Sequence, residues 1–153
     1  MAYIPKGLYL EEFEIGKIYE SQGRTVTEAD VVNFAGLSGD FNVLHTDEQF
    51  ANRQSPFKKR IAHGMLGASI MTGLSNQMGL FDGTTLAFLE LTIRYKNPLQ
   101  IGDTVHLEIE PTEIIPGSKP ERGVVKFDTR LKNQEGTLIT ESPWTIMMKA
   151  GRP

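Results

Sequence analysis

The second half of the 153-residue chain alternates apolar and polar side chains along four segments. In the first of these segments the apolar positions are Leu89, Leu91, Ile93 and Tyr95. The same period of two recurs within residues 105–110, 125–131 and 137–149. Because neighbouring side chains of a strand point to opposite faces, this pattern predicts strands with one buried and one solvated face. The sequence therefore predicts an antiparallel sheet whose apolar face must be covered.

The segment that precedes these strands, "HGMLGASIMTGLSNQMG" at 63–79, is apolar almost all round and rich in small residues. A helix that is apolar on every side is expected to be buried. Its small residues would let a sheet or a ligand approach closely. This helix is the obvious cover for the sheet, so we expect an α+β fold in which an antiparallel sheet wraps around one long central helix.

The first half of the chain predicts shorter elements. Residues 1–16 are expected to be an extended lead-in, and residues 17–26 a first strand. Thr27 is a candidate N-cap, with Asp30 in the first turn of the helix that follows. The apolar stripe of this helix is formed by Val31, Val32, Phe34, Ala35 and Leu37, and Gly36 and Gly39 are expected to end it. Asp47 could cap a short helix that Pro56 stops.

The composition is that of a soluble globular protein, with 39% hydrophobic residues, 23% charged residues and a formal net charge of -3. The length predicts a single domain over residues 1–153. Lys and Arg form no basic stripe, which argues against nucleic-acid binding. The chain has no cysteine, which excludes disulfides and thiol nucleophiles. No apolar run reaches the ~18 residues that a membrane helix needs, and no secretion signal is apparent, so we expect a cytoplasmic protein without membrane contact.

Three polar side chains stand close together in the stretch "GDFNVLH" at 39–45, namely Asp40, Asn42 and His45. Placed in one pocket, the carboxyl group and the imidazole could share a water molecule and move protons to and from it. Asn42 could fix that water or brace the loop.

A second stretch, "RIAHGML" at 60–66, places His63 and Gly64 where the apolar helix should begin. Backbone N–H groups at such an end lack intrahelical partners, and the positive end of the helix dipole lies behind them. These donors suit an oxygen that gains negative charge during a reaction.

Each of these residues also has a structural interpretation. Asx turns explain many Asp-x-Asn clusters, His45 could be a hydrogen-bonded core residue, and His63 could brace the start of the helix. The cluster also raises the question of a metal. Its oxygens and single imidazole lack the other ligands of a calcium loop, and no second histidine stands at helical spacing for zinc. We therefore predict that no metal is bound.

The stretches "FAGLSGDFNVLHTDEQFA" (34–51) and "PFKKRIAHGML" (56–66) together resemble the signature of the MaoC-like R-specific enoyl-CoA hydratases and dehydratases. The family pattern is an aromatic residue, small residues, D-x-N-P-x-H-x-D and an alanine, followed by R-I-x-H-G-M-L. The resemblance extends through "NPLQIGD" (97–103) and covers most of the chain from Thr27 to Lys149. Val43 stands where the family usually has proline. The resemblance implies the hot-dog fold, in agreement with the pattern of elements.

The resemblance also implies an activity, the addition of water to trans-2-enoyl-CoA to give (R)-3-hydroxyacyl-CoA, or the reverse dehydration. By position, Asp40 and His45 are similar to the catalytic pair of the family, and Asn42 to its supporting amide. The Gly64 N–H corresponds to the donor for the thioester oxygen. No cofactor is implied, because coenzyme A is part of the substrate.

Further residues are candidates for substrate binding. The acyl chain is expected along the central helix, where the candidate residues are His63, Met65, Leu66, Ser69 and Ile70. Any one of them could equally be only core. The basic residues Lys58, Lys59 and Arg60 precede this helix and could meet the phosphates of coenzyme A, or form a solvated face.

Three rival functions remain open at the level of sequence. One is a hot-dog acyl-CoA thioesterase. Another is a dehydratase that acts on acyl carrier protein or on a short branched or polar enoyl-CoA. The last is a non-catalytic acyl-CoA-binding or regulatory module. We also expect a homodimer or a higher homo-oligomer, because the strand around Leu89 to Tyr95 is a candidate sheet edge and hot-dog domains of the family pair through such edges.

Overall fold

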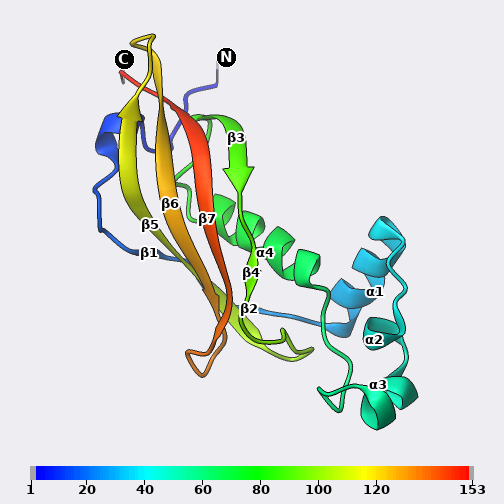
Figure 1. Cartoon of the computed structure of the whole chain (residues 1–153). Coiled ribbons are helices and arrows are strands. Elements are labelled where there is room, and N and C mark those ends of the chain that lie inside the picture. Colours follow the sequence, from blue (N-terminus) through cyan, green and yellow to red (C-terminus); the bar gives the residue numbers. More distant parts are fainter. Residues whose placement is uncertain (1–2, 152–153) are drawn as a thin grey trace.

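The computed structural model describes residues 3–151, and its main feature is an antiparallel sheet of seven strands (Figure 1). The long strands lie in the order β5-β6-β7-β3, with the short β1 on the far side of β5. Of the other short strands, β2 pairs with β5 and β4 pairs with β7. The strands are β1 (Tyr19–Glu20), β2 (Arg24–Thr25), β3 (Thr85–Leu91), β4 (Arg94–Tyr95), β5 (Thr104–Pro116), β6 (Arg122–Lys132) and β7 (Leu138–Lys149). The predicted sheet is confirmed.

The alternation along β5 and β6 sorts side chains as the sequence predicts. Every second residue is buried along β6 and along β5 as far as Pro111, including Leu107, Phe127 and Leu131. The outward side chains form ion pairs across the strands: Arg130 binds Glu108 and Glu110 at 3.0 Å and 2.8 Å. The sheet therefore has one apolar and one charged face.

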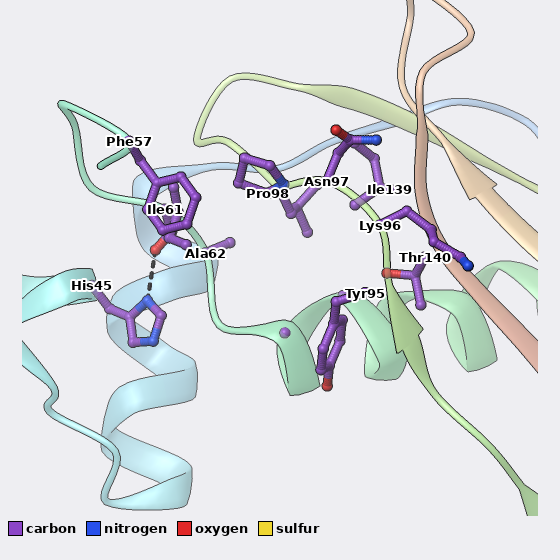
Figure 2. A pocket seen from close by; sticks show the side chains of 13 residues that line it. His45, Phe57, Ile61, Ala62, Tyr95, Lys96, Asn97, Pro98, Ile139 and Thr140 are labelled. Atoms are coloured by element: carbon purple, nitrogen blue, oxygen red, sulfur yellow. Dashed lines mark hydrogen bonds between the residues drawn. The ribbon is translucent and has the colours of Figure 1, made fainter. Parts of the chain in front are cut away.

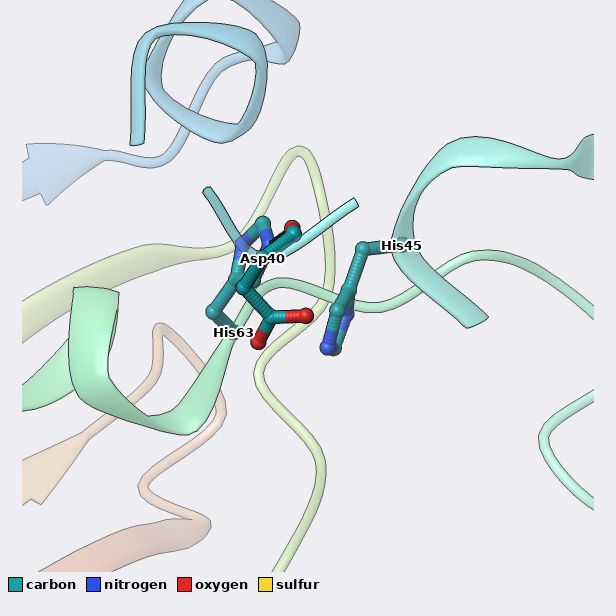
Figure 3. A group of neighbouring side chains, drawn as sticks. All are labelled: Asp40, His45 and His63. Carbon is teal, nitrogen blue, oxygen red and sulfur yellow. Dashed lines mark hydrogen bonds between the residues drawn. The ribbon is translucent and has the colours of Figure 1, made fainter. Parts of the chain in front are cut away.

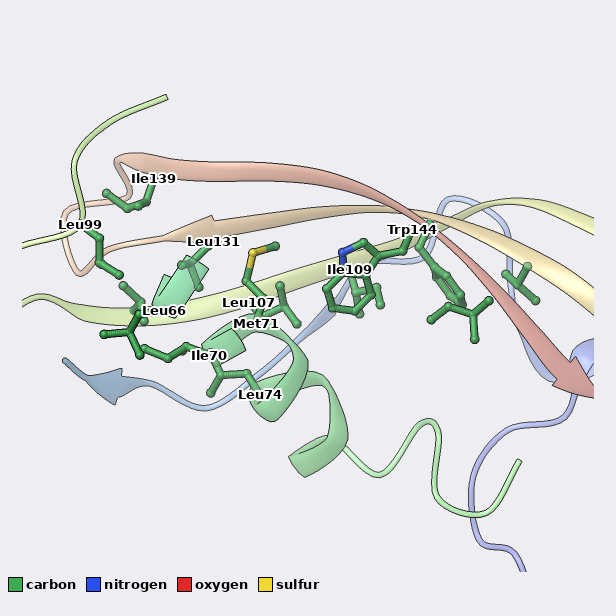
Figure 4. Close-up of a cluster of buried hydrophobic side chains, with 14 of the residues drawn as sticks. Leu66, Ile70, Met71, Leu74, Leu99, Leu107, Ile109, Leu131, Ile139 and Trp144 are labelled. Atoms are coloured by element: carbon green, nitrogen blue, oxygen red, sulfur yellow. The ribbon is translucent and has the colours of Figure 1, made fainter. Parts of the chain in front are cut away.

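Helix α4 (Gly64–Gln77) lies across the apolar face of the sheet (Figure 1). Its buried residues pack against the inner sides of β5, β6 and β7, as Figure 4 shows for Leu66, Ile70, Met71 and Leu74. The opposite side of the helix is open: Met65 is 54% exposed, and Ser69, Thr72 and Gly73 are also exposed. The prediction that α4 is buried on every side is therefore wrong for the single chain, because the sheet covers only one side.

Three short helices gather beyond the N-terminal end of α4 (Figure 1): α1 (Glu28–Ser38), α2 (Val43–Thr46) and α3 (Glu48–Gln54). Thr27 caps α1, and Asp47 caps α3 by accepting the N–H of Phe50 at 2.9 Å, so both predicted caps are confirmed.

Helix α1 departs from the prediction at three positions. It runs through Gly36 and ends only at Gly39, whose φ of 75° closes the last turn. Val32 is exposed and Leu37 is 85% exposed, so the predicted apolar stripe is too wide. Only Val31 and Ala35 of this helix are fully buried, since α1 contacts the remaining structure along a narrow face.

The N-terminal segment is more ordered than a plain extended lead-in. It contains a 3-10 turn, η1 (Leu10–Glu12), and buries Leu10 and Phe13 in the core. The single strand expected over 17–26 is instead two short strands, β1 and β2, that both pair with β5. Within residues 3–151, no helix is long and apolar enough to cross a bilayer.

Strand β3 forms an edge of the sheet, as predicted, because among the described strands it pairs with β7 alone. Its apolar side chains do not reach the core, however. Leu89 is 49% exposed, and Leu86, Phe88 and Leu91 are similarly open, so the predicted burial of the Leu89–Leu91 row is wrong in the single chain. A hydrophobic edge strand with free backbone groups is a surface that proteins normally cover.

Candidate functional site

The loop between α1 and α2 is shaped by two hydrogen bonds, each from a backbone N–H to the side chain two residues earlier. The Asp40 carboxylate accepts the backbone N–H of Asn42 at 3.2 Å, and the Asn42 side-chain oxygen accepts the N–H of Leu44 at 3.0 Å. The second contact caps α2 and so fixes the helix that carries His45. Asn42 therefore braces the loop, which is one of the two roles that the sequence allows.

The His45 ring is oriented by a backbone carbonyl. Its Nδ1 lies 2.8 Å from the carbonyl oxygen of Ile61. A carbonyl can only accept, so Nδ1 carries the hydrogen and Nε2 of the neutral ring keeps a free lone pair. Figure 3 shows the Asp40 carboxylate turned toward this ring. The pair can hold one polar molecule between an acid oxygen and a basic nitrogen.

His63 joins the loop to the start of α4. It is only 2% exposed, and its Nε2 donates to the backbone carbonyl of Asp40 at 2.9 Å. Its ring lies against the His45 ring, with centroids 3.9 Å apart and the planes tilted by 33°, and packs against Phe34 on another side. Its Nδ1 is buried and has no hydrogen-bond partner within residues 3–151. These contacts place His63 between Asp40 and Gly64, where it holds the loop against the start of α4.

Gly64 is the first residue of α4, and the N–H groups of the first turn lack intrahelical partners. A side chain at this position would require the Tyr95 ring to move. A Cβ atom at this position would lie 2.5 Å from Cζ of Tyr95 and 2.9 Å from its hydroxyl oxygen. Glycine therefore lets the Tyr95 ring pack directly on the helix start.

Tyr95 is a site residue that the sequence did not reveal. The alternating pattern placed it in an apolar row of a strand, and nothing in that pattern connects β4 with a residue 31 positions earlier. Figure 2 shows His45 and Tyr95 on either side of the turn that begins α4.

A half-open, mostly apolar cavity of about 330 Å³ adjoins His45 and Gly64 (Figure 2). Its walls include Phe57 and Ile61 from the segment before α4, Pro98 and Leu99 from the loop after β4, and Ile139 from β7. The sequence analysis did not assign these residues to a cavity, although Phe57, Ile61, Pro98 and Leu99 lie in the stretches that carry the family resemblance.

The structure separates the predicted acyl-binding residues of α4. Leu66 and Ile70 point into the core between helix and sheet, whereas Met65 and Ser69 lie on the exposed side. None of these four lines the cavity beside His45.

The predicted basic residues also differ from one another. Lys58 and Lys59 are exposed, but the donors of Arg60 are engaged. Arg60 binds Glu28 at 2.7 Å and 2.9 Å and Glu48 at 2.7 Å. The hydrogen bonds that Arg60 donates to Glu28 hold the pKa of Glu28 below its usual value. The bonds that it donates to Glu28 and Glu48 raise the pKa of Arg60. Arg60 thus ties α1 and α3 to the segment that enters α4.

Asp40, His45 and His63 each offer one potential metal ligand atom, and these atoms lie within 4.8 Å of one another. A metal must lie in the plane of an imidazole to bind its nitrogen. The His45 and His63 rings are tilted by 33°, with centroids 3.9 Å apart. In addition, Nε2 of His63 already donates to Asp40. The absence of a bound metal stays a prediction.

Comparisons with known proteins identify relatives of the whole domain. A family model described as a MaoC like domain matches residues 12–132. The 3-hydroxybutyryl-CoA dehydratase of Methylorubrum extorquens is 34% identical over 115 residues, 75% of this chain and 71% of that protein. The (R)-specific enoyl-CoA hydratase of Rhodospirillum rubrum is 32% identical over 142 residues, 93% of this chain and 92% of that protein.

A solved structure shows the fold. A hypothetical protein of Mycobacterium tuberculosis, described as having a double hot-dog fold, aligns with a TM-score of 0.81 at 17% identity. The alignment covers 96% of this chain and 46% of that one. The predicted hot-dog fold is confirmed.

The carbonyl contacts predict the tautomers of both site histidines. In its neutral form, His45 should carry its hydrogen on Nδ1 and His63 on Nε2. Long-range 1H–15N spectra of labelled protein distinguish the two forms, and the variants His45→Gln and His63→Gln assign the signals. Finding His45 protonated on Nε2 instead would contradict the geometry of the site.

Proposed function

The chain belongs to the MaoC-like family of hydratases and dehydratases, and on that premise we propose that it adds water to trans-2-enoyl-CoA to give (R)-3-hydroxyacyl-CoA. The reverse dehydration follows by the same route. One observation carries the proposal. A carboxylate oxygen of Asp40 and a ring nitrogen of His45 lie within 4.8 Å of each other, beside the backbone N–H groups at the start of α4.

The residues divide the reaction between them. A water molecule held by the Asp40 carboxylate and Nε2 of His45 loses a proton as its oxygen bonds to C3. The C2–C3 π electrons move toward the thioester, whose oxygen gains negative charge near the Gly64 N–H. A proton then passes to C2, so the elements of one water are added. Asp40 and His45 act as a coupled pair, and the proton belongs to the pair rather than to one member.

The hydrogen bond from His45 to Ile61 supports this assignment. It leaves Nε2 as the nitrogen that accepts a proton, and the imidazolium that forms lies close to the Asp40 carboxylate. No cofactor takes part, since coenzyme A enters with the substrate.

The substrate would lie with its thioester at Gly64 and its apolar part against the cavity of about 330 Å³. Met65 and Ser69 would join its binding where a second chain covers the open side of α4. For the phosphates of coenzyme A we retain Lys58 and Lys59, because Arg60 is engaged by Glu28 and Glu48. These contacts do not select between coenzyme A and acyl carrier protein, nor do they set the acyl group.

The proposal predicts that Asp40→Asn and His45→Ala each lose at least ~100-fold in hydration rate, because each removes a proton-transfer group. The matched controls are Asp128→Asn and His106→Gln, which change the same residue types on the outer side of the sheet. The assay follows the loss of enoyl absorbance of crotonyl-CoA, and thermal unfolding checks the fold. Near-normal turnover in either site variant at unchanged stability would rule out the assigned pair.

The same incubation separates the hydratase from its rivals. Hydration leaves the thioester intact, so titration should detect no free coenzyme A thiol. Thiol release without hydration would identify a thioesterase. Binding without either change would identify a passive acyl-CoA module.

We further propose that two copies of the chain pair through β3. This strand has free backbone groups along one side and exposed Leu86, Phe88, Leu89 and Leu91. Two identical strands can pair antiparallel about a two-fold axis, which satisfies both edges at once. The pairing would also bring a second chain near the open side of α4.

A homodimer should therefore appear by light scattering at micromolar concentration, with twice the 17.1 kDa mass of the chain. Leu89→Lys should weaken it, because a lysine on an edge strand opposes pairing. The control Lys126→Glu changes an exposed charge on β6, away from this edge. A fully active wild-type protein with the mass of one chain would exclude the dimer.

A further inference from the structure

The Tyr95 hydroxyl is a polar group that the proposed reaction does not yet use. Tyr95 comes from β4 and lies with its ring against the first residue of α4. The side chain lines the cavity beside His45 and is 54% exposed. Within residues 3–151 its hydroxyl has no hydrogen-bond partner, although it lies next to the helix start. A donor so placed is available to a ligand.

The distance to the Gly64 N–H suits a shared acceptor. The hydroxyl oxygen lies 2.9 Å from the position of a Cβ on Gly64, and a Cβ lies about 2.5 Å from its own nitrogen. The hydroxyl and the Gly64 nitrogen are thus at most about 5.5 Å apart. Two hydrogen bonds of about 2.8 Å can span this separation, so one oxygen can accept from both groups.

We propose that the Tyr95 hydroxyl is a second donor to the thioester oxygen, beside the Gly64 N–H. The inference rests on the proposed function and adds to it, because the family resemblance supplies only the Gly64 donor. The hydroxyl donates a hydrogen bond and keeps its proton throughout. The atoms and charges of the hydration step are therefore balanced as before.

Two properties suit Tyr95 to this role. Burial of part of the side chain raises the pKa of the hydroxyl above its usual 10.0, so it remains a donor at neutral pH. The thioester oxygen gains negative charge as C3 is attacked, and a hydrogen bond to it strengthens during that step. The hydroxyl then lowers the barrier more than it strengthens binding of the ground state.

Tyr95→Phe tests the donor, because it removes one oxygen and keeps the ring that packs on Gly64. We expect kcat for crotonyl-CoA hydration to fall at least ~10-fold, below the ~100-fold of a fully enclosed oxyanion donor because Tyr95 is half open to solvent. KM and the thermal unfolding midpoint should change little. Tyr19→Phe, on β1 at the far side of the sheet, is the matched control and should retain wild-type kcat. Wild-type kcat in Tyr95→Phe would overturn the inference.

The vibrational spectrum of the bound thioester gives a readout that does not depend on turnover. With 13C-labelled butyryl-CoA, which cannot be hydrated, two donors should lower the carbonyl stretching frequency more in wild type than in Tyr95→Phe. Equal frequencies would overturn the inference even if hydration were slow. The two measurements also distinguish the two proposals. A wild-type protein that does not hydrate crotonyl-CoA would refute the proposed function. Equal carbonyl frequencies in wild type and Tyr95→Phe would refute the role of Tyr95 alone.

Discussion

Two hydrogen bonds from imidazole N–H groups to backbone carbonyls hold the site together. His45 donates to Ile61 and His63 donates to Asp40, so each histidine crosses between the loop at 39–46 and the segment that enters α4. These bonds fix the tautomer of each ring as well as its position. The acid oxygen, the basic nitrogen and the helix donors consequently face one small space, although they come from separate parts of the chain.

The sheet, α4 and the short helices hold these groups in position. The sheet positions α4 by burying Leu66, Ile70, Met71 and Leu74, and α4 in turn presents its first N–H groups at the end of the core. Arg60 joins α1 and α3 through Glu28 and Glu48, which steadies the short helices on which Asp40 and His45 depend. Because Gly64 carries no side chain, Tyr95 from the sheet can reach the same point.

Local patterns of the sequence predicted local structure well. The period of two gave β5, β6 and β7, and single residues such as Thr27 and Asp47 marked helix starts. Some errors are local, such as the end of α1 and the split of residues 17–26 into two strands. Others concern surfaces: the exposed rows of β3 and α4 are apolar or small, and a pattern cannot tell whether its own chain or a second chain covers them. Within the candidate site, Asp40, Asn42 and His45 stand together in sequence, so the motif alone brings them to attention. The contact of His63 with Asp40 and that of Tyr95 with Gly64 join distant positions, so only the folded chain reveals them.

The central claim is that one water, held by Asp40 and His45 on one side of the substrate, supplies both the hydroxyl and the proton. Hydration of crotonyl-CoA in D2O tests this most directly, with the product examined by NMR. We predict one deuterium at C2, on the same face as the new hydroxyl at C3, and the R configuration at C3. Deuterium on the opposite face, or an equal mixture of both faces, would show that the proton and the hydroxyl come from different places and would contradict the account.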